Sequence, residues 1–289
     1  MTTLTQMSRK LVVVVTGSSR GLGYGIVKTL AATQHLQPLI IYATSREGSQ
    51  LNISPSYGNE VRYSTLDITS KSSITKFLHL ALDQDSPNHA VDILINNAGI
   101  NLDDDYSYQR AVAEFETNYR GTRKMCELFL SEQGGKMWRN PGARIVNVSS
   151  SASQLTGYSS HIQACFRDAN LTLEDLDALA AEYLSAVESE TEYETGWGHE
   201  GSAYAVSKAC VNALTRIMAR EHTEVLVNCC DPGWVATDIG RQSGEGGKTP
   251  EQGAKIPVRL AVGDVGGVSG RFWANGDMRS LKDGEVMEW

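Results

Sequence analysis

The chain has 289 residues, 41% of them hydrophobic, and a formal net charge of −8. This length and composition fit one large α/β domain with a full core and argue against wholesale disorder. The acidic balance argues against nucleic acid or an anionic membrane as a main partner. No apolar run approaches the roughly 20 residues that a membrane-spanning helix requires.

The termini and the cysteines bear on compartment. Residues 1–10 are polar, and the apolar run Leu11–Val15 is too short for the core of a signal peptide. The five cysteines show neither metal-ligand nor CxxC spacing. We therefore predict a cytoplasmic protein with reduced thiols and no metal site. Residues 1–10 are predicted to be an N-terminal tail of a single domain that spans 1–289.

Strand-like apolar runs alternate with helical patterns along the chain. The predicted strands are Leu11–Val15, Leu39–Ala43, Val61–Leu66, Val91–Ile95, Arg144–Val148, Val225–Cys229 and, more weakly, Arg271–Ala274. The predicted helices are Leu22–Thr33, Ser72–Leu82, Ala111–Leu130, Leu173–Val187, Ala203–Arg220 and Pro250–Val262. Strands that are apolar throughout and separated by helices predict a doubly wound, Rossmann-type α/β fold. Its parallel sheet should have about seven strands, covered by helices on both faces.

A glycine-rich turn follows the first strand, and a helix follows the turn. This setting places backbone N–H groups and a helix N-terminus against a pyrophosphate. The spacing Gly-x-x-x-Gly-x-Gly differs from the commonest dinucleotide fingerprint, and glycines that merely form a tight turn are the alternative. The predicted cofactor contacts of this turn are Gly17, Ser19, Arg20, Gly21, Leu22 and Gly23.

Two arginines indicate which nucleotide is bound. The second strand ends in Ala43-Thr44-Ser45-Arg46, where an acidic residue would favour NAD and an arginine accommodates a 2′-phosphate. Arg20 could converge on the same phosphate. Two solvated surface arginines are the alternative, and Glu47 follows Arg46 directly. We predict NADP(H).

The third and fourth strands end in polar residues. Asp67, followed by Ile68, could accept a hydrogen bond from the adenine amino group, although Asp67 or Thr69 could instead cap the next helix. Asn97, Ala98 and Gly99 follow the fourth strand, where open α/β sheets bind ligands. Such residues are also ordinary in turns.

Tyr204 and Lys208 lie four residues apart, on one face of a predicted helix. A nearby ammonium favours the phenolate and should lower the pKa of the phenol, which suits a group that exchanges a proton with a substrate oxygen. Tyr24 and Lys28 show the same spacing, so the pair alone does not identify a site.

These motifs, taken in order, resemble the short-chain dehydrogenase/reductase family from about residue 11 to the C-terminus. The motifs are Thr16–Gly23, Asp67-Ile68, Asn96–Gly99, Asn118, Val148-Ser149-Ser150, Tyr204–Lys208 and Pro232-Gly233. Tyr24–Lys28 matches no role in the family. Read without the resemblance, Ser149 and Ser150 are ordinary strand-end residues, and Asn118 is a polar position on a long helix.

The resemblance implies a catalytic set and further cofactor contacts. Tyr204 would be the general acid in reduction, and Lys208 would assist it and bind the nicotinamide ribose. Ser150 would steady the substrate oxygen, and Asn118 would support a water that links Lys208 to solvent. The further cofactor contacts would be Asn97, Ala98, Gly99, Tyr204, Lys208, Pro232, Gly233, Val235 and Thr237.

An insertion separates Ser150 from Tyr204, which follows it by 54 positions. Residues 151–201 contain a capping-box-like helix start at Thr172 and an apolar stripe that must bury against something, most simply the domain itself. The stripe is Leu173, Leu176, Leu179, Ala180, Tyr183, Leu184 and Val187. This insertion resembles that of the monomeric NADPH-dependent carbonyl reductases, which implies a monomer.

One loop departs from the carbonyl reductases that accept glutathione adducts. Asp103, Asp104 and Asp105 follow the Asn-Asn-Ala-Gly motif, where those enzymes carry apolar and basic residues, and would repel the anionic tripeptide. Trp234 and Trp197 are predicted aromatic walls of the substrate pocket. His199 is more simply an exposed loop residue.

The resulting function prediction is NADPH-dependent reduction of a small-molecule ketone, aldehyde or quinone. One alternative is a dehydrogenase or tailoring reductase committed to a single metabolite. The other is a non-catalytic NADP-binding module that senses nucleotide or holds a partner, which the intact catalytic set disfavours.

Overall fold

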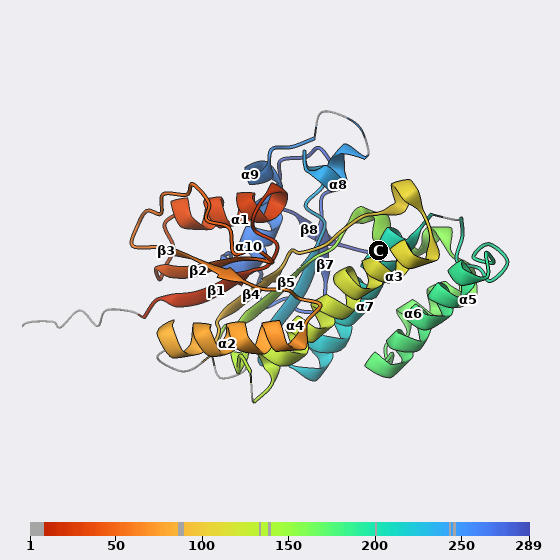
Figure 1. Cartoon of the computed structure of the whole chain (residues 1–289), viewed down its shortest axis with the longest axis horizontal. Helices are drawn as coiled ribbons and strands as arrows, with labels where there is room; N and C mark the ends of the chain where they lie inside the picture. Colours follow the sequence, from red (N-terminus) through yellow and green to blue (C-terminus); the bar gives the residue numbers. More distant parts are fainter. Residues whose placement is uncertain are drawn as a thin grey trace, which may run out of the picture.

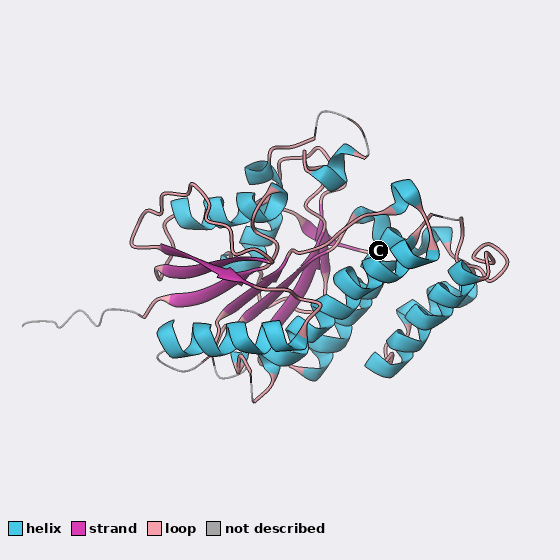
Figure 2. Ribbon diagram, in the orientation of Figure 1, coloured by secondary structure: helices cyan, strands magenta, loops and turns pink. Residues whose placement is uncertain are grey.

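A mixed sheet forms the centre of the molecule, with helices on both faces (Figures 1 and 2). The computed structural model describes residues 9–85, 90–132, 134–137, 140–199, 201–242, 244 and 247–289. Of the predicted tail, residues 1–8 lie outside the described residues. Arg9 already belongs to the fold, because its guanidinium binds both oxygens of the buried Asp92 carboxylate at 2.5 and 2.8 Å.

Eight strands make up the sheet, in the order β3-β2-β1-β4-β5-β6-β7-β8. They are β1 (Leu11–Val15), β2 (Leu39–Ser45), β3 (Glu60–Thr65), β4 (Ile93–Asn96), β5 (Arg144–Val148), β6 (Leu226–Cys230), β7 (Phe272–Ala274) and β8 (Glu285–Met287). All neighbours pair in parallel except β7 and β8. The predicted doubly wound fold is confirmed, but the predicted count of about seven strands misses β8. That strand has three residues, two of them exposed, so it carries no apolar pattern.

The helices divide between the two faces of the sheet. They are α1 (Gly21–Ala32), α2 (Lys71–Asp85), α3 (Tyr108–Glu114), α4 (Thr122–Leu130), α5 (Ser160–Arg167), α6 (Leu173–Glu188), α7 (Ala203–Glu221), α8 (Asp238–Arg241), α9 (Pro250–Gly253) and α10 (Lys255–Val262). Val12 and Val14 pack toward α2, α4 and α7, whereas Val13 and Val15 pack toward α1 and α10. The alternation of side chains along β1 therefore supplies both layers of the core.

Two predicted helices differ from the observed ones. The helix predicted over Ala111–Leu130 begins at Tyr108 and contains a π-helical segment, Phe115–Gly121, between α3 and α4. The helix predicted over Pro250–Val262 is divided at Ala254 into α9 and α10. Pro257 has no N–H to donate to the carbonyl of Gly253, which removes one hydrogen bond from a continuous helix.

The insertion forms two helices, α5 and α6, that lie beyond α7 from the sheet (Figure 1). The predicted capping box is present: Thr172 Oγ1 accepts from Asp175 N at 3.1 Å, and Asp175 Oδ2 accepts from Thr172 N at 3.0 Å. The apolar stripe of α6 joins the main core, and Tyr183 stacks on Phe115 at 5.4 Å between ring centroids. Burial of the stripe against the domain itself is thus confirmed, while α5 was not predicted.

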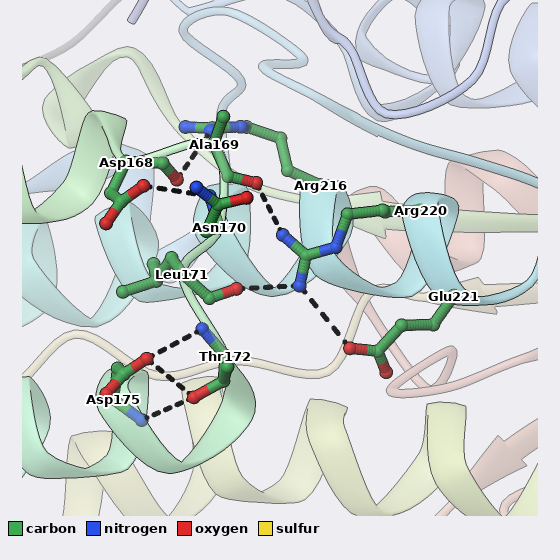
Figure 3. Close-up of polar contacts among 9 residues, drawn as sticks. All are labelled: Asp168, Ala169, Asn170, Leu171, Thr172, Asp175, Arg216, Arg220 and Glu221. Carbon is green, nitrogen blue, oxygen red and sulfur yellow. Dashed lines mark hydrogen bonds and ion pairs between the residues drawn. The ribbon is translucent and has the colours of Figure 1, made fainter.

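Two arginines of α7 hold the turn between α5 and α6 (Figure 3). Arg216 donates to the carbonyls of Phe166 at 2.9 Å and Asp168 at 3.1 Å. Arg220 donates to those of Ala169 at 2.6 Å and Leu171 at 2.8 Å. The carbonyl groups at a helix end and in the following turn have no N–H donor within the helix. Here the guanidinium groups of Arg216 and Arg220 are their donors. The insertion is therefore fastened to the helix that carries Tyr204.

The strand order reverses at β1, whose neighbours are β2 and β4. In open α/β sheets, ligands bind beyond the carboxyl ends of the strands at such a point. The turns after β1, β4 and β5 lie at this point, and they carry several of the residues predicted to be functional.

Candidate active site

The glycine turn after β1 is fitted closely against the end of β4. Gly17 has φ +65°, and a Cβ added there would lie 2.8 Å from the Cα of Ala98. Thr16 Oγ1 accepts from the backbone N–H groups of Asn97 and Ala98, each at 3.0 Å. A Cβ on Gly23 would lie 2.4 Å from the Gly17 carbonyl oxygen. Only glycine fits at these two positions.

Helix α1 begins at this turn without a side-chain cap. Arg20 occupies the N-cap position and makes no capping hydrogen bond. The first N–H groups of the helix therefore remain available to an anion, at the positive end of the helix dipole. Ser19 and Arg20 are exposed beside them, and Gly21 and Leu22 are partly exposed.

The two arginines predicted to read a 2′-phosphate are both exposed on this side of the sheet. Arg20 pairs with Asp238 at 2.8 Å, with 81% of its side chain exposed. Arg46 follows β2 directly and forms no ion pair within the described part of the chain. Its charge helps to lower the pKa of Asp67, after a larger contribution from the Thr69 hydroxyl.

Asp67 does not cap the helix that follows it. Its Oδ1 accepts from Thr69 N at 2.9 Å and from Thr69 Oγ1 at 2.7 Å. The cap of α2 comes instead from Ser70, whose Oγ accepts from Ser73 N at 3.3 Å. The capping alternative for Asp67 and Thr69 is therefore wrong, and adenine recognition by Asp67 stays a prediction. Ile68 beside it is buried, at 6% exposure.

The loop after β6 returns over the glycine turn. A Cβ added to Gly21 would lie 3.0 Å from Cγ2 of Thr237, and Arg20 reaches Asp238 of the same loop. Lys248 Nζ donates to the Pro232 carbonyl at 3.0 Å, which fixes the start of the loop. Gly233 has φ +75°, and Val235 is 5% exposed. The glycine turn after β1 and the loop after β6, which both carry residues predicted to contact the cofactor, therefore lie next to each other.

Tyr204 and Lys208 lie on the first turns of α7, next to the end of β5. The Lys208 Nζ is 5.6 Å from the centre of the Tyr204 ring, and it donates to the Val148 carbonyl at 2.9 Å. The Ser150 hydroxyl lies within hydrogen-bonding reach of the Tyr204 phenol. Serine, phenol and ammonium therefore meet at one place, as the sequence predicts.

Asn118 lies against the same cluster, in the middle of the π-helical segment. Its Nδ2 donates to Ser207 Oγ at 3.0 Å. A Cβ added to Gly99 would lie 3.1 Å from Asn118 Oδ1 and 3.4 Å from Lys208 Nζ, so Gly99 lies directly against both side chains. A π-helical turn is frequent at functional sites because it redirects one residue out of the regular ladder.

Electrostatics at Tyr204 differ from the sequence-based argument. Burial raises the pKa of the Tyr204 phenol, the carboxyl groups of Asp231, Glu114 and Asp103 raise it further, and the Ser150 hydroxyl opposes them. Burial also lowers the pKa of Lys208 to about 8. The predicted lowering of the Tyr204 pKa is therefore wrong for the protein's own groups, because desolvation outweighs the ammonium. A phenol that stays protonated retains the proton that a donor needs.

Three acidic residues near Tyr204 were not predicted to contribute to the catalytic centre. Asp231 is 5% exposed and accepts from Gly233 N at 2.9 Å. Glu114 is fully buried, and Asp103 Oδ2 accepts from Tyr204 N at 3.2 Å. One signal was present: Glu114 precedes Asn118 by four positions, so a carboxyl group shares the helix face of a predicted catalytic residue.

The residues predicted to line the substrate pocket lie in different settings. Trp234 donates from Nε1 to the Gly240 carbonyl at 2.8 Å, in the loop after β6. Trp197 is 1% exposed and packs edge-on against Tyr183 at 5.3 Å, which favours a core position. Both pocket roles stay predictions. His199 is exposed and stacks on Tyr193.

The second Tyr/Lys pair lies on α1 and has a different environment. Lys28 Nζ binds Glu251 at 2.6 Å on the surface. The Lys28 ammonium is therefore paired with Glu251, which lies outside the cluster of Ser150, Tyr204 and Lys208. Spacing alone does not separate this pair from Tyr204 and Lys208, whereas the surroundings do.

Two searches of the described residues bear on site class. No group of three or more His, Cys, Asp or Glu side chains there could hold a metal ion. No helix there is both long and apolar enough to cross a membrane.

Comparison with known proteins identifies the family. Residues 11–162 match the family model described as short chain dehydrogenase, and residues 185–268 match the model described as Enoyl-(Acyl carrier protein) reductase. The chain belongs to the short-chain dehydrogenase family. It is therefore an oxidoreductase, and the family predicted from the ordered motifs is confirmed.

Similar proteins of this family come from animals and plants. The chain is 32% identical to Carbonyl reductase [NADPH] 1 of Mus musculus, over 98% of this chain and 99% of the relative. It is 32% identical to (+)-neomenthol dehydrogenase of Arabidopsis thaliana, over 86% and 90%. Salutaridine reductase from Papaver somniferum superposes with a TM-score of 0.75 at 26% identity, covering 91% of this chain and 99% of that one.

Proposed function

We propose that this short-chain dehydrogenase reduces the carbonyl group of a small ketone, aldehyde or quinone, with NADPH as reductant. One observation carries the proposal: the hydroxyl groups of Ser150 and Tyr204 lie within hydrogen-bonding reach of each other, next to Lys208 and Asn118 at the carboxyl ends of the strands. A phenol and a hydroxyl held together can bind one carbonyl oxygen between them. The printed name of the mouse relative supports both NADPH and the carbonyl substrate.

The residues present fit a dinucleotide phosphate. The cradle formed by Gly17, Gly21 and Gly23 leaves the N-terminus of α1 open to the pyrophosphate. Arg46 and Arg20 would hold a 2′-phosphate by charge-assisted hydrogen bonds, and Asp67 would accept from the adenine amino group. The nicotinamide, when bound, supplies the hydride.

The side chains would then divide the remaining work. Ser150 and Tyr204 would hold the substrate oxygen, and Tyr204 would donate its proton there as negative charge develops. The ammonium of Lys208 would stabilise the phenolate that remains and bind the nicotinamide ribose. Asn118 would support a water between Lys208 and solvent, through which Tyr204 regains its proton.

A panel of ketones, aldehydes and quinones tests the proposal directly. We expect NADPH consumption, followed as loss of absorbance, with at least one class of carbonyl. In the reverse direction, we expect the protein to oxidise an alcohol with the oxidised nucleotide. If NADPH binds tightly, no carbonyl in the panel reacts and a protein partner co-purifies in fixed ratio, the chain is a nucleotide-binding module and not a reductase.

A second candidate is a reductase committed to one metabolite. The names of the Arabidopsis and Papaver relatives favour it, since each names a single compound. The same panel separates the two candidates. Turnover of many carbonyl compounds supports a general carbonyl reductase, whereas turnover of a single ketone in the panel supports an enzyme dedicated to one metabolite.

The packed insertion also supports a monomeric enzyme. Helix α6 buries its apolar stripe against the chain itself, so it covers surface that a second subunit could otherwise use. We expect sizing chromatography with light scattering to give a mass near the chain's 31.5 kDa. A mass near twice that value at micromolar concentration contradicts the monomer.

A further inference from the structure

Helix α7 is capped from a distant part of the chain. Ser202, at its N-cap position, makes no capping hydrogen bond and donates its hydroxyl to the His199 carbonyl at 2.7 Å. The Asp103 carboxylate replaces it, accepting from Tyr204 N at 3.2 Å and also from the backbone of Ala203, 101 and 100 positions away. A carboxylate at a helix N-terminus satisfies free N–H groups and complements the dipole.

Glu114 lies behind Asp103, at the last residue of α3. It is fully buried, and its Oε1 accepts from the backbone N–H of Leu102. Its carboxyl group lies within hydrogen-bonding reach of the Asp103 carboxyl group. Among the described residues, Asp103 Oδ1 and Glu114 Oε2 are buried and have no hydrogen-bond partner. Two carboxylates this close cannot both be ionised at low cost, but one shared proton satisfies both oxygens.

The loop between these groups also reaches Asn118. Ile100 N donates to Asn118 Oδ1 and the Ile100 carbonyl accepts from Asn118 Nδ2, both at 2.8 Å. Three residues of the loop therefore form hydrogen bonds outside it. Ile100 bonds to Asn118 and Leu102 bonds to Glu114. Asp103 bonds to the first turn of α7. Two residues of the proposed catalytic set are connected through four residues of chain.

We propose that Asp103 and Glu114 form a proton-sharing acid pair that locks this loop onto α7 and so positions Tyr204 and Asn118. Both are positioning residues, because they act through the backbone of α7 and through the loop. Their consequence for turnover rests on the proposed reductase function, whereas the pair itself does not. Loss of the shared proton would leave two adjacent carboxylates, weakening the link between loop and helix.

The surroundings favour a shared proton at neutral pH. Burial, with a contribution from Asp103, raises the pKa of Glu114 to about 8, and burial raises the pKa of Asp103. Several charged or titratable groups interact with the pair, mostly at a distance: Asp104 on the same loop, Tyr204 and Lys208 of α7, Tyr106 after the loop and Tyr183 of α6. Lys208 is the only cation among them and is itself buried. The pair therefore keeps its proton at pH values well above the usual pKa of a carboxyl group.

The effect of pH on stability follows from that shift. The folded state binds a proton that the unfolded state releases near pH 4.3, so the free energy of unfolding falls as pH rises from about 4.3 toward 8. The contribution of the pair is fully present below that window and lost above it.

Glu114→Gln tests the pair, because its amide donates permanently where the shared proton would lie. We expect the melting temperature of the native protein to fall between pH 5 and 9, and that fall to be reduced in E114Q. Asp105→Asn removes an exposed charge from the same loop that pairs with Arg110 at 2.5 Å, and it is the matched control; its melting temperature should keep the pH dependence of the native protein. Equal slopes for E114Q and the native protein overturn the proposal.

Kinetics provide the second readout. We expect Glu114→Ala to lower kcat roughly tenfold or more, with the KM for NADPH changed less than twofold, since misplaced catalytic groups slow the chemical step. E114Q should restore most of kcat and lose one ionisation from the alkaline limb of the kcat–pH profile. If E114A and E114Q reduce kcat equally with unchanged pH profiles, the role is only structural packing and the proposal fails. The melting experiment needs no substrate, so a failed carbonyl panel leaves it intact.

Discussion

Replacing Tyr204 by phenylalanine should lower kcat for any accepted carbonyl by roughly 10²–10⁴-fold, the usual contribution of a positioned general acid. The substitution removes only the hydroxyl, which lies within hydrogen-bonding reach of Ser150 and carries the proton in the proposed mechanism. The partly exposed ring still fits beside Lys208, so the fold and the affinity for NADPH should change little. Steady-state kinetics and titration of NADPH fluorescence measure the two effects separately.

Tyr24→Phe provides the matched control, since Tyr24 stands in the same spacing to Lys28 on α1. Lys28 is paired with Glu251 on the surface, so this change should leave kcat within about twofold. Full turnover by Y204F on a substrate that the native protein reduces sinks the proposed mechanism. A comparable loss in Y24F instead points to a general effect on the fold.

Replacing Arg46 and Arg20 together by alanine should raise the KM for NADPH roughly 10- to 100-fold and leave the KM for NADH almost unchanged. A charge-assisted hydrogen bond to a phosphate is worth a factor of this size, and only NADPH carries the 2′-phosphate. Arg46 alone should account for most of the effect, because Arg20 already pairs with Asp238. Initial rates with the two nucleotides at a fixed carbonyl concentration measure the ratio.

Arg167→Ala serves as the control for the loss of a surface cation. Arg167 is exposed at the end of α5. Within the described part of the chain its side chain bonds only to Gln163 of the same helix, so its removal should change neither KM. An R20A/R46A protein that still prefers NADPH as strongly as the native protein contradicts 2′-phosphate recognition by these arginines. Loss of affinity for both nucleotides equally indicates damage to the glycine turn instead.

Local regularities account for what could be predicted from the sequence. Strands such as β1 and β2 were found because they are short β-branched runs that are buried on both faces, and the amphipathic stripe of α6 was found because it repeats at helical spacing. Tyr204 and Lys208 lie within the predicted helix α7 and Asn118 lies within the helix predicted over Ala111–Leu130, whereas Ser150 follows β5. Their roles were predicted from the order of the family motifs. Strand β8 escaped prediction because three residues at an exposed edge carry no such periodicity.

The chain's sequence by itself therefore determined the family and the parallel sheet, and it predicted a catalytic set from the order of the family motifs. The tertiary structure alone decided what surrounds Tyr204. Burial reverses the expected shift of its pKa, and Asp103, which the sequence suggests only as a repulsive surface charge, caps α7 beside Glu114. The physical reason is that desolvation and capping depend on which distant segments pack together. Asp103 and Tyr204 are 101 positions apart, so no local sequence pattern indicates their contact.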